Sequence, residues 1–174
     1  SRTAHELSAK GIFICTNVLI GQNEKIATAT RISADIKIDG ALKEAEWLMT
    51  PKANHFIQYS PFNGAEPTEQ TFVRFLYDDD ALYIAAFMED SKPHKISKSL
   101  GRRDNFNLAD YFGIYIDPYN DASKSFGFFV TASGVQVDVK VTNGYDYRWN
   151  AVWESAVMHT PDGWGVEMRI PYSA

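Results

Sequence analysis

The densest group of side chains suited to ligand binding lies between Tyr145 and Glu154, near the C-terminal end of the sequence. A sugar presents apolar C–H faces and hydroxyl edges, so a site for it needs a flat aromatic ring together with amide, carboxylate or guanidinium groups. This segment supplies both, and we predict that Trp149, Asn150 and Trp153 form a platform for an oligo- or polysaccharide. The alternative is that Trp153 begins a strand and is buried in the core, as large aromatics usually are, while Trp149 in the preceding loop is exposed.

A second polar group consists of Arg102, Arg103 and Asp104, which precede a predicted strand. Two arginines and an aspartate could grip a polar ligand through paired hydrogen bonds, which would make them partners for the same sugar. They could also tie down their own loop, since an acid flanked by arginines usually pairs with them. We favour the role of fixing the loop, and ligand binding by these three residues stays a second hypothesis.

Clustered side-chain oxygens make the turn from Asp117 to Asp121 a candidate metal site. Asp117, Asn120 and Asp121 carry the carboxylate and amide oxygens that Ca²⁺ prefers. The Asp-Pro and Asn-Asp pairs in this turn are also ordinary turn formers. We therefore predict that a metal ion, if one is present, is structural calcium bound here, and that the protein requires no cofactor.

Signatures of catalysis are missing from the sequence. It contains no Gly-x-Ser-x-Gly elbow, no His-Glu-x-x-His helix and no phosphate-binding glycine loop. Its four histidines are far apart in the chain: His5, His55, His94 and His159. A glycosidase needs only two facing carboxylates, but we interpret Glu167 and Arg169, on one face of a strand, as a charge pair. We predict a binding protein and not an enzyme.

The composition fits a single domain. With 174 residues, of which 45% are hydrophobic, the chain can bury a sizeable core. Its net charge of -5 and isoelectric point near 5.3 argue against nucleic acid as a partner. Cys15 is the single cysteine, which excludes a disulfide framework and a thiolate metal cluster. We expect the isolated domain to be a monomer.

Alternation of apolar and polar residues dominates the sequence from Ile36 onward. A period of two is typical of strands with one buried face, and turn-forming pairs such as Asn63-Gly64 and Asp162-Gly163 separate them. The pattern is clearest at 73–77, 112–116, 126–130, 135–142 and 164–170, and residues 82–87 predict a more fully buried strand. Many short strands without a long helix predict an all-β fold, an antiparallel, jelly-roll-like β-sandwich.

Two short stretches are predicted to be helical. Ala41 to Leu48 can form a turn after the Asp39-Gly40 break, with Trp47 folded back into the core. Lys95 to Leu100 is the second and weaker candidate. Trp164 falls at a core position of its strand, so we predict that Trp47 and Trp164 are both structural.

Three segments in this order carry a specific resemblance: Ile38 to Trp47, Leu76 to Ile84 and Trp164 to Pro171. Together they resemble the carbohydrate-binding family 9-like domain, in the form found at the N-terminus of large bacterial surface proteins with a DUF5916-type C-terminal region. The resemblance runs from Thr30 to the last residue. It implies a non-catalytic β-sandwich that binds sugar and often carries structural calcium. Leu100 to Asp104 is similar to a motif of the same subgroup.

The resemblance also implies which residues would hold a sugar. In sugar-binding members, a loop of the form Asn-x-x-Trp supplies a stacking ring and a hydroxyl partner, and Asn150 and Trp153 match that spacing. A second ring and a carboxylate are implied at two further positions, where Asn107 and Gly113 stand instead. Phe106 could replace the ring, but Gly113 offers no carboxylate. The resemblance therefore implies a site that is open on one side and binds weakly.

Residues 1–28 form an N-terminal extension, separate from the domain that we place at residues 29–174. An apolar stretch from Gly11 to Gly21 follows Lys10 and is too short to span a bilayer as a helix. It fits either the core of an export signal or an added strand. We expect an exported module, periplasmic or at the cell surface and associated with the outer membrane, cut from a longer protein.

Other functions stay open. The domain could be an interaction or scaffold module that contacts the rest of its own longer chain and binds no sugar. Wider relatives of this sandwich include modules associated with glycoside hydrolases and haem-binding domains, for which Met88 and His94 are the pair that lies close in sequence. An exposed ring beside unpaired polar groups favours sugar binding, and buried rings favour the scaffold.

Overall fold

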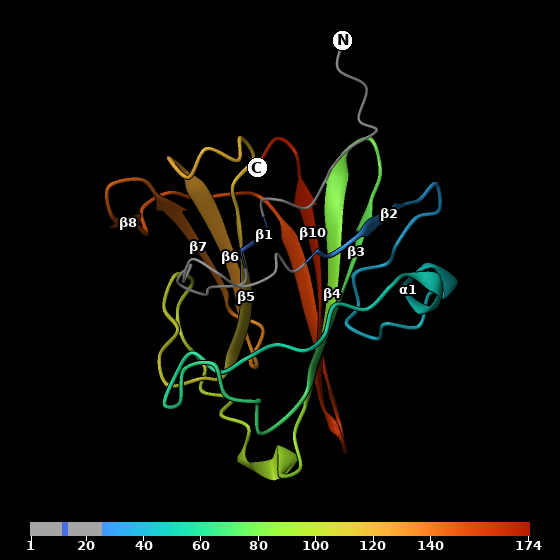
Figure 1. Ribbon diagram of the computed structural model, residues 1–174, viewed down its shortest axis with the longest axis vertical. Helices are drawn as coiled ribbons and strands as arrows, with labels where there is room; N and C mark the ends of the chain where they lie inside the picture. The colour runs from blue at the N-terminus through green and yellow to red at the C-terminus, as the bar shows by residue number, and fades with distance from the viewer. Residues whose placement is uncertain (1–11, 14–25) are drawn as a thin grey trace.

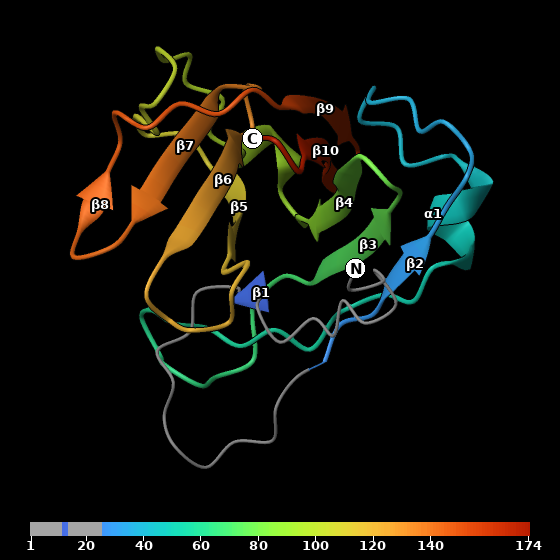
Figure 2. The same cartoon turned by 90° about the horizontal axis from the view of Figure 1, so that it is seen from above.

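The computed structural model describes residues 12–13 and 26–174, and in this part of the chain two five-stranded sheets face each other (Figures 1 and 2). Sheet A has the order β1 (Ile12–Phe13), β5 (Tyr111–Ile116), β6 (Ser125–Thr131), β7 (Gln136–Val141) and β8 (Tyr145–Asp146). Sheet B has the order β2 (Ala29–Arg31), β3 (Thr71–Tyr77), β4 (Ala81–Glu89), β10 (Gly163–Pro171) and β9 (Glu154–Thr160). All neighbouring strands are antiparallel except β2 and β3, which confirms the predicted β-sandwich.

The main core lies between the two sheets, because apolar side chains alternate on the sides that face each other. Sheet B contributes buried residues of β10 that follow the predicted period of two: Trp164, Val166, Met168 and Ile170. Sheet A contributes residues of β5 and β6: Phe112, Ile114, Phe128 and Val130. Trp164 is therefore part of the core, as predicted.

Strand β7 is buried on both faces, whereas its sequence predicts one buried face. Asp138 stands opposite Phe128 in the β6–β7 register, so this carboxylate shares the inner face with a core ring. Val137 and Val139 point the other way and pack against Phe129 on the outer face of sheet A. Alternation separates the two faces of a strand but does not tell which one meets the core.

The first predicted helix is present but shorter than expected. Helix α1 spans Ala45–Met49, and Trp47 within it is fully buried. Its indole packs on the outer face of sheet B, in a second cluster with Leu76, Tyr83 and Ala85. The prediction that Trp47 is structural is confirmed, although the cluster lies outside the sandwich interior.

The second predicted helix, Lys95 to Leu100, is wrong. A single 3₁₀ turn, η1, covers Pro93–Lys95, and the chain after it is irregular. The Ser97 amide donates to Asp110 Oδ2 (2.8 Å), and the Ser97 hydroxyl donates to the carbonyl of Leu108. Serine readily bonds to nearby backbone and so competes with a helix, and here its partners lie in the loop before β5.

Glu167 and Arg169 do not pair with each other, contrary to the prediction. Glu167, on the outer face of β10, is fully buried, and its Oε2 accepts the backbone N–H groups of Asp39 (2.9 Å) and Gly40 (2.6 Å). Its Oε1 accepts Nε1–H of Trp47 (2.9 Å). Arg169 instead bonds Glu154 on β9 (3.2 Å). The carboxylate joins the segment that leads into α1 to the last strand of sheet B.

The N-terminal stretch is described only in part. Ile12–Phe13 pair antiparallel with Ile116 and Tyr115 of β5. The rest of the apolar stretch, including Cys15, lies outside the described residues, so the export-signal and added-strand interpretations stay predictions. Among the described residues, no helix is both long enough and apolar enough to cross a membrane.

Candidate functional site

A buried carboxylate organises the region where the predicted site residues meet. Asp138 has no exposed surface. Its Oδ1 accepts Nε1–H of Trp153 (2.6 Å), and its Oδ2 accepts the backbone N–H of Ala151 (2.9 Å) and Nη2–H of Arg103 (2.6 Å). A charge can be buried only when it is paired and hydrogen-bonded. Asp138 therefore connects β7, the loop before β9 and the loop before β5.

Arg103 and Asp104 close the part of β7 that β8 leaves free. Strand β8 pairs only with Lys140 and Val141. Nearer the start of β7, the Asp104 amide donates to the Gln136 carbonyl (3.1 Å), and the amide of Asp138 donates to Asp104 Oδ1 (3.2 Å). These bonds satisfy backbone groups of a strand edge.

Arg103 reaches across this loop to the predicted sugar-binding segment. It donates to the Asp138 carboxylate, the Gln136 amide oxygen, the Ala151 carbonyl (3.1 Å) and Asn150 Oδ1 (3.3 Å). The structure thus brings together Arg103, Asp104, Asn150 and Trp153 from the predicted set. Arg102 directly precedes Arg103 in sequence and is exposed.

The two predicted stacking tryptophans are not equally accessible. Trp153 is 6% exposed, and its ring packs against Phe128. Trp149 is half-buried, with its ring centroid 4.9 Å from Phe126 and 5.8 Å from Phe128. Trp149 is thus less exposed than its loop position predicts, because the loop folds its ring back against the aromatic residues of β6.

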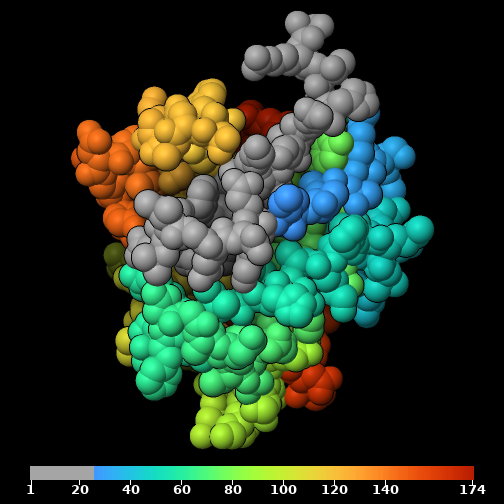
Figure 3. Space-filling view, viewed as in Figure 1, coloured from blue at the N-terminus to red at the C-terminus, as the bar shows by residue number. Residues whose placement is uncertain are grey.

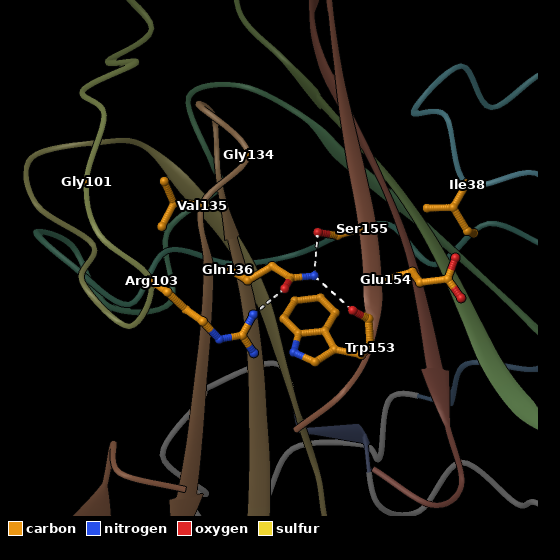
Figure 4. Close-up of a pocket in the computed structure, with 9 residues that line it drawn as sticks. All are labelled: Ile38, Gly101, Arg103, Gly134, Val135, Gln136, Trp153, Glu154 and Ser155. Carbon is orange, nitrogen blue, oxygen red and sulfur yellow. Dashed lines mark hydrogen bonds between the residues drawn. The ribbon is translucent and has the colours of Figure 1, made fainter. Parts of the chain in front are cut away.

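A cavity of about 570 Å³ opens beside this network (Figure 4). It lies between the start of β7 and the start of β9, with the loop before β5 along one side. Its lining residues are Ile38, Gly101, Arg103, Gly134, Val135, Gln136, Trp153, Glu154 and Ser155. Figure 4 shows the Gln136 amide at the centre, where its Nε2 donates to the Trp153 carbonyl (3.2 Å) and to Ser155 Oγ (3.0 Å).

The polar groups of the cavity keep part of their hydrogen-bonding capacity. Arg103 uses four hydrogen bonds, which leaves one of its five N–H groups. Ser155 accepts from Gln136 and still has its hydroxyl proton to donate. Glu154 is exposed, and its carboxylate accepts from Arg169 through one oxygen. The cavity therefore offers donors and acceptors together, the combination that a hydroxyl group needs.

Comparison with known proteins identifies the family. The profile of the family described as carbohydrate family 9 binding domain-like matches residues 38–174. This chain belongs to that family. A search of curated proteins gives no match.

Two solved structures of carbohydrate binding module family 9 (CBM9) share the fold. Both are from Caldicellulosiruptor kristjanssonii, one in complex with cellotriose and one in complex with glucose. The first has 20% identity and a TM-score of 0.56, and the match covers 84% of this chain and 67% of that chain. The second has 20% identity and a TM-score of 0.55, and the match covers 84% and 70%.

The structure explains why two positions implied by the CBM9 resemblance hold other residues here. A Cβ added to Gly113 would lie 2.0 Å from the Phe129 ring, which covers this position on the outer face of sheet A. Asn107 has a left-handed φ of 51°, and its backbone N–H donates to Asn105 Oδ1 (2.8 Å). Asn tolerates this conformation far better than a bulky residue. Phe106 packs its ring 5.2 Å from Phe129 and so belongs to the same aromatic cluster.

The predicted calcium turn is built on backbone contacts. Asp117 Oδ1 accepts the amides of Tyr119 (3.1 Å) and Asn120 (2.8 Å), and its Oδ2 accepts that of Ala122 (2.8 Å). Asp121 accepts the Ser123 amide (2.8 Å). In the described part of the chain, no three His, Cys, Asp or Glu residues are placed to hold a metal ion. Asp117, Asn120 and Asp121 therefore do not fit a calcium site. The formation of the turn explains why these residue types are found here.

We expect the same melting temperature in EDTA and in millimolar Ca²⁺, because metal binding would have to displace three amide donors from Asp117. Differential scanning calorimetry measures this. Asp117→Asn is the matched variant, since it removes the charge and keeps one acceptor. A rise in melting temperature with Ca²⁺ that this variant abolishes would contradict the expectation.

Met88 and His94, the pair considered for haem, lie in different surroundings. Met88 is on β4 and packs against the main core. His94 is exposed in η1.

Sequence reasoning missed several residues of the cavity: Ile38, Gln136, Glu154 and Ser155. It also missed Asp138. The available signal was the pair Gln136 and Asp138 on one face of β7, but that face was expected to be exposed. The contacts that give both residues a role come from loops far away in the sequence.

Proposed function

We propose that this domain is a non-catalytic carbohydrate-binding module, and that a sugar unit binds in the cavity between β7 and β9. The observation that supports it best is the convergence of Arg103, Gln136, Glu154 and Ser155 beside the indole of Trp153. Family membership agrees with this function, and two proteins of similar fold are described in complex with cellotriose and glucose.

The cavity is widely open to solvent, and its volume is that of a small-ligand site. About 570 Å³ lies within the range of roughly 300–1,000 Å³ that such sites span. Ser155 and the remaining N–H of Arg103 would donate to sugar oxygens, and Glu154 would accept from sugar hydroxyls. Ile38 and the edge of Trp153 would contact C–H groups. Arg102 and Asn150, both exposed, would extend the polar rim.

Affinity is expected to be weak, because the cavity holds few free polar groups and Trp153 exposes little of its ring. A dissociation constant of about 1 mM, or about -4 kcal/mol, is expected. Titration of the domain with glucose and with cellotriose, followed by ¹H–¹⁵N NMR, measures it.

Ser155 gives the sharpest test of the site. Ser155→Phe should fill the cavity and abolish binding, and Ser155→Ala should weaken it by removing one donor. Ser123→Phe, in the exposed turn after β5, is the matched control and should bind as the parent does. Unchanged affinity in Ser155→Phe would place the site elsewhere. A parent domain that binds no glycan would favour the scaffold function, which the buried ring of Trp153 also fits.

The wider setting is part of the proposal. We propose that the module is exported and acts at the periplasmic face or cell surface, as part of a longer protein with a DUF5916-type region whose remaining chain it contacts. A link to glycoside hydrolases fits the same setting, with this domain as the accessory binding part.

A further inference from the structure

The clearest exposed aromatic surface on the predicted sugar-binding segment is formed by two tyrosines and not by tryptophan. Tyr145, in β8, is 63% exposed, and Tyr147, just after it, is 45% exposed. Their rings are nearly parallel, with an interplanar angle of 20° and centroids 6.3 Å apart. By contrast, the rings of Trp149 and Trp153 are packed against Phe128.

The register shows where this pair points. Tyr145 stands opposite Val141 of β7, and Val141 packs with Val137 and Val139 on the outer face of sheet A. Strand β8 is the last strand of the sheet (Figure 1), and the orange part of the chain that contains it forms the left edge of the surface in Figure 3. The two rings therefore stand on an accessible edge.

An ion pair lies in the same segment as the two rings. Asp146 and Arg148 form an ion pair (3.0 Å), and the hydrogen bond from Arg148 lowers the pKa of the Asp146 carboxyl. The pair has no net charge at neutral pH. It still offers polar groups to hydroxyls, because the Arg148 side chain is 92% exposed. Asp146 stands opposite Lys140 and therefore lies on the other face of β8 from Tyr145. The rings themselves present the uncharged flat face that a pyranose needs.

The position along the chain connects the rings to the cavity. Trp153 lies six positions after Tyr147 in sequence, which is at most about 20–22 Å of chain. Between them, the side chain of Asn150 is held by Arg103 at the cavity. A ligand that fills the cavity and extends along this loop would reach the rings only if it is longer than one sugar unit.

We propose that Tyr145 and Tyr147 are the stacking platform for the further units of a neutral oligosaccharide whose first unit lies in the cavity. This inference rests on the proposed function and adds to it a preference for chains over monosaccharides. Stacking on the two faces should strengthen the binding of a chain about tenfold.

The test compares Tyr145→Ala/Tyr147→Ala with the parent domain, using glucose and cellotriose as probes. The double variant should fold normally, because both side chains are largely exposed, and its melting temperature checks this. We expect cellotriose affinity to fall about tenfold and glucose affinity to stay the same. Tyr119→Ala, which removes a 73% exposed tyrosine from a distant turn, is the matched control and should change neither.

Each outcome decides between the two proposals. If the parent binds cellotriose and the double variant binds it equally well, the platform is overturned while the proposed function stands. If the parent binds neither sugar, both fail. A loss of self-association in the double variant without loss of sugar affinity would make this edge a contact between copies and overturn the platform. Loss of glucose binding as well, with normal binding by Ser155→Phe, would make the rings the first binding site. It would overturn both the cavity site and the role of the rings as a platform for further units.

Discussion

Replacing Asp138 by alanine is expected to lower the free energy of unfolding by about 3–5 kcal/mol, because it removes a fully buried carboxylate that accepts several hydrogen bonds. The variant leaves Arg103 without its buried partner and leaves two further donors unpaired, Nε1–H of Trp153 and the amide of Ala151. Each unsatisfied buried group costs about 1–3 kcal/mol. Urea denaturation followed by tryptophan fluorescence measures the loss.

A paired variant shows whether the network or the single carboxylate matters. Arg103→Met combined with Asp138→Leu removes the charge on both sides, so its cost should be smaller than the sum of the two single variants. Sugar affinity should fall in every variant that displaces the Trp153 side chain from its position. Equal midpoints for Asp138→Ala and the parent, at equal m-values, would show that the network contributes nothing to stability.

The sequence predicts those parts of the fold that local pattern decides. The alternation from Trp164 to Ile170 identifies both a strand and its buried side, because every second residue is large and apolar. The turn after Asp39-Gly40 and the burial of Trp47 follow in the same way from neighbouring residues.

The pattern fails where both faces of a strand are buried. In β7, the valines lie on the outer face against Phe129, whose ring occupies the place where a side chain at Gly113 would lie, while Asp138 faces inward. An alternating strand is compatible with either orientation, and contacts with residues distant in sequence, such as Arg103 and Trp153, decide between them.

The sequence names four of the residues that the structure brings together, but neither the others nor their arrangement. Arg103, Asp104, Asn150 and Trp153 do meet, since polar groups in adjacent loops of a sandwich converge at the strand ends. Their shared partner, Asp138, could not be recognised because its burial depends on contacts across 13 to 35 residues of sequence. The same holds for Glu167, whose indole partner is 120 residues away.

Replacing Trp47 by alanine is expected to cost about 3–5 kcal/mol of unfolding free energy, the usual range for a fully buried tryptophan. The loss has two parts. A cavity opens beside Leu76 and Tyr83, and Glu167 loses the N–H that holds its Oε1. Trp47→Phe fills most of the cavity but removes the same N–H. It should therefore destabilise the protein less than Trp47→Ala, and the loss of the hydrogen bond to Glu167 should account for most of its cost.

The pH dependence of stability separates these two parts. Burial raises the pKa of the Glu167 carboxyl above its ordinary 4.5, although the amides of Gly40 and Asp39 and the indole of Trp47 work against the rise. Between 4.5 and the raised pKa, the folded state binds more protons than the unfolded state, so the contribution of this group to stability falls as the pH increases.

Trp47→Phe removes one of the donors that favour the ionised form. Its pKa for Glu167 should therefore lie higher still, and its stability should fall over a wider pH range than that of the parent. Urea midpoints from pH 4.5 to 8 measure this, with Glu167→Gln as the control that lacks the titrating group. A parent whose dependence over this range matches that of Glu167→Gln would contradict the assignment, because the carboxyl would then titrate alike in the folded and unfolded chains.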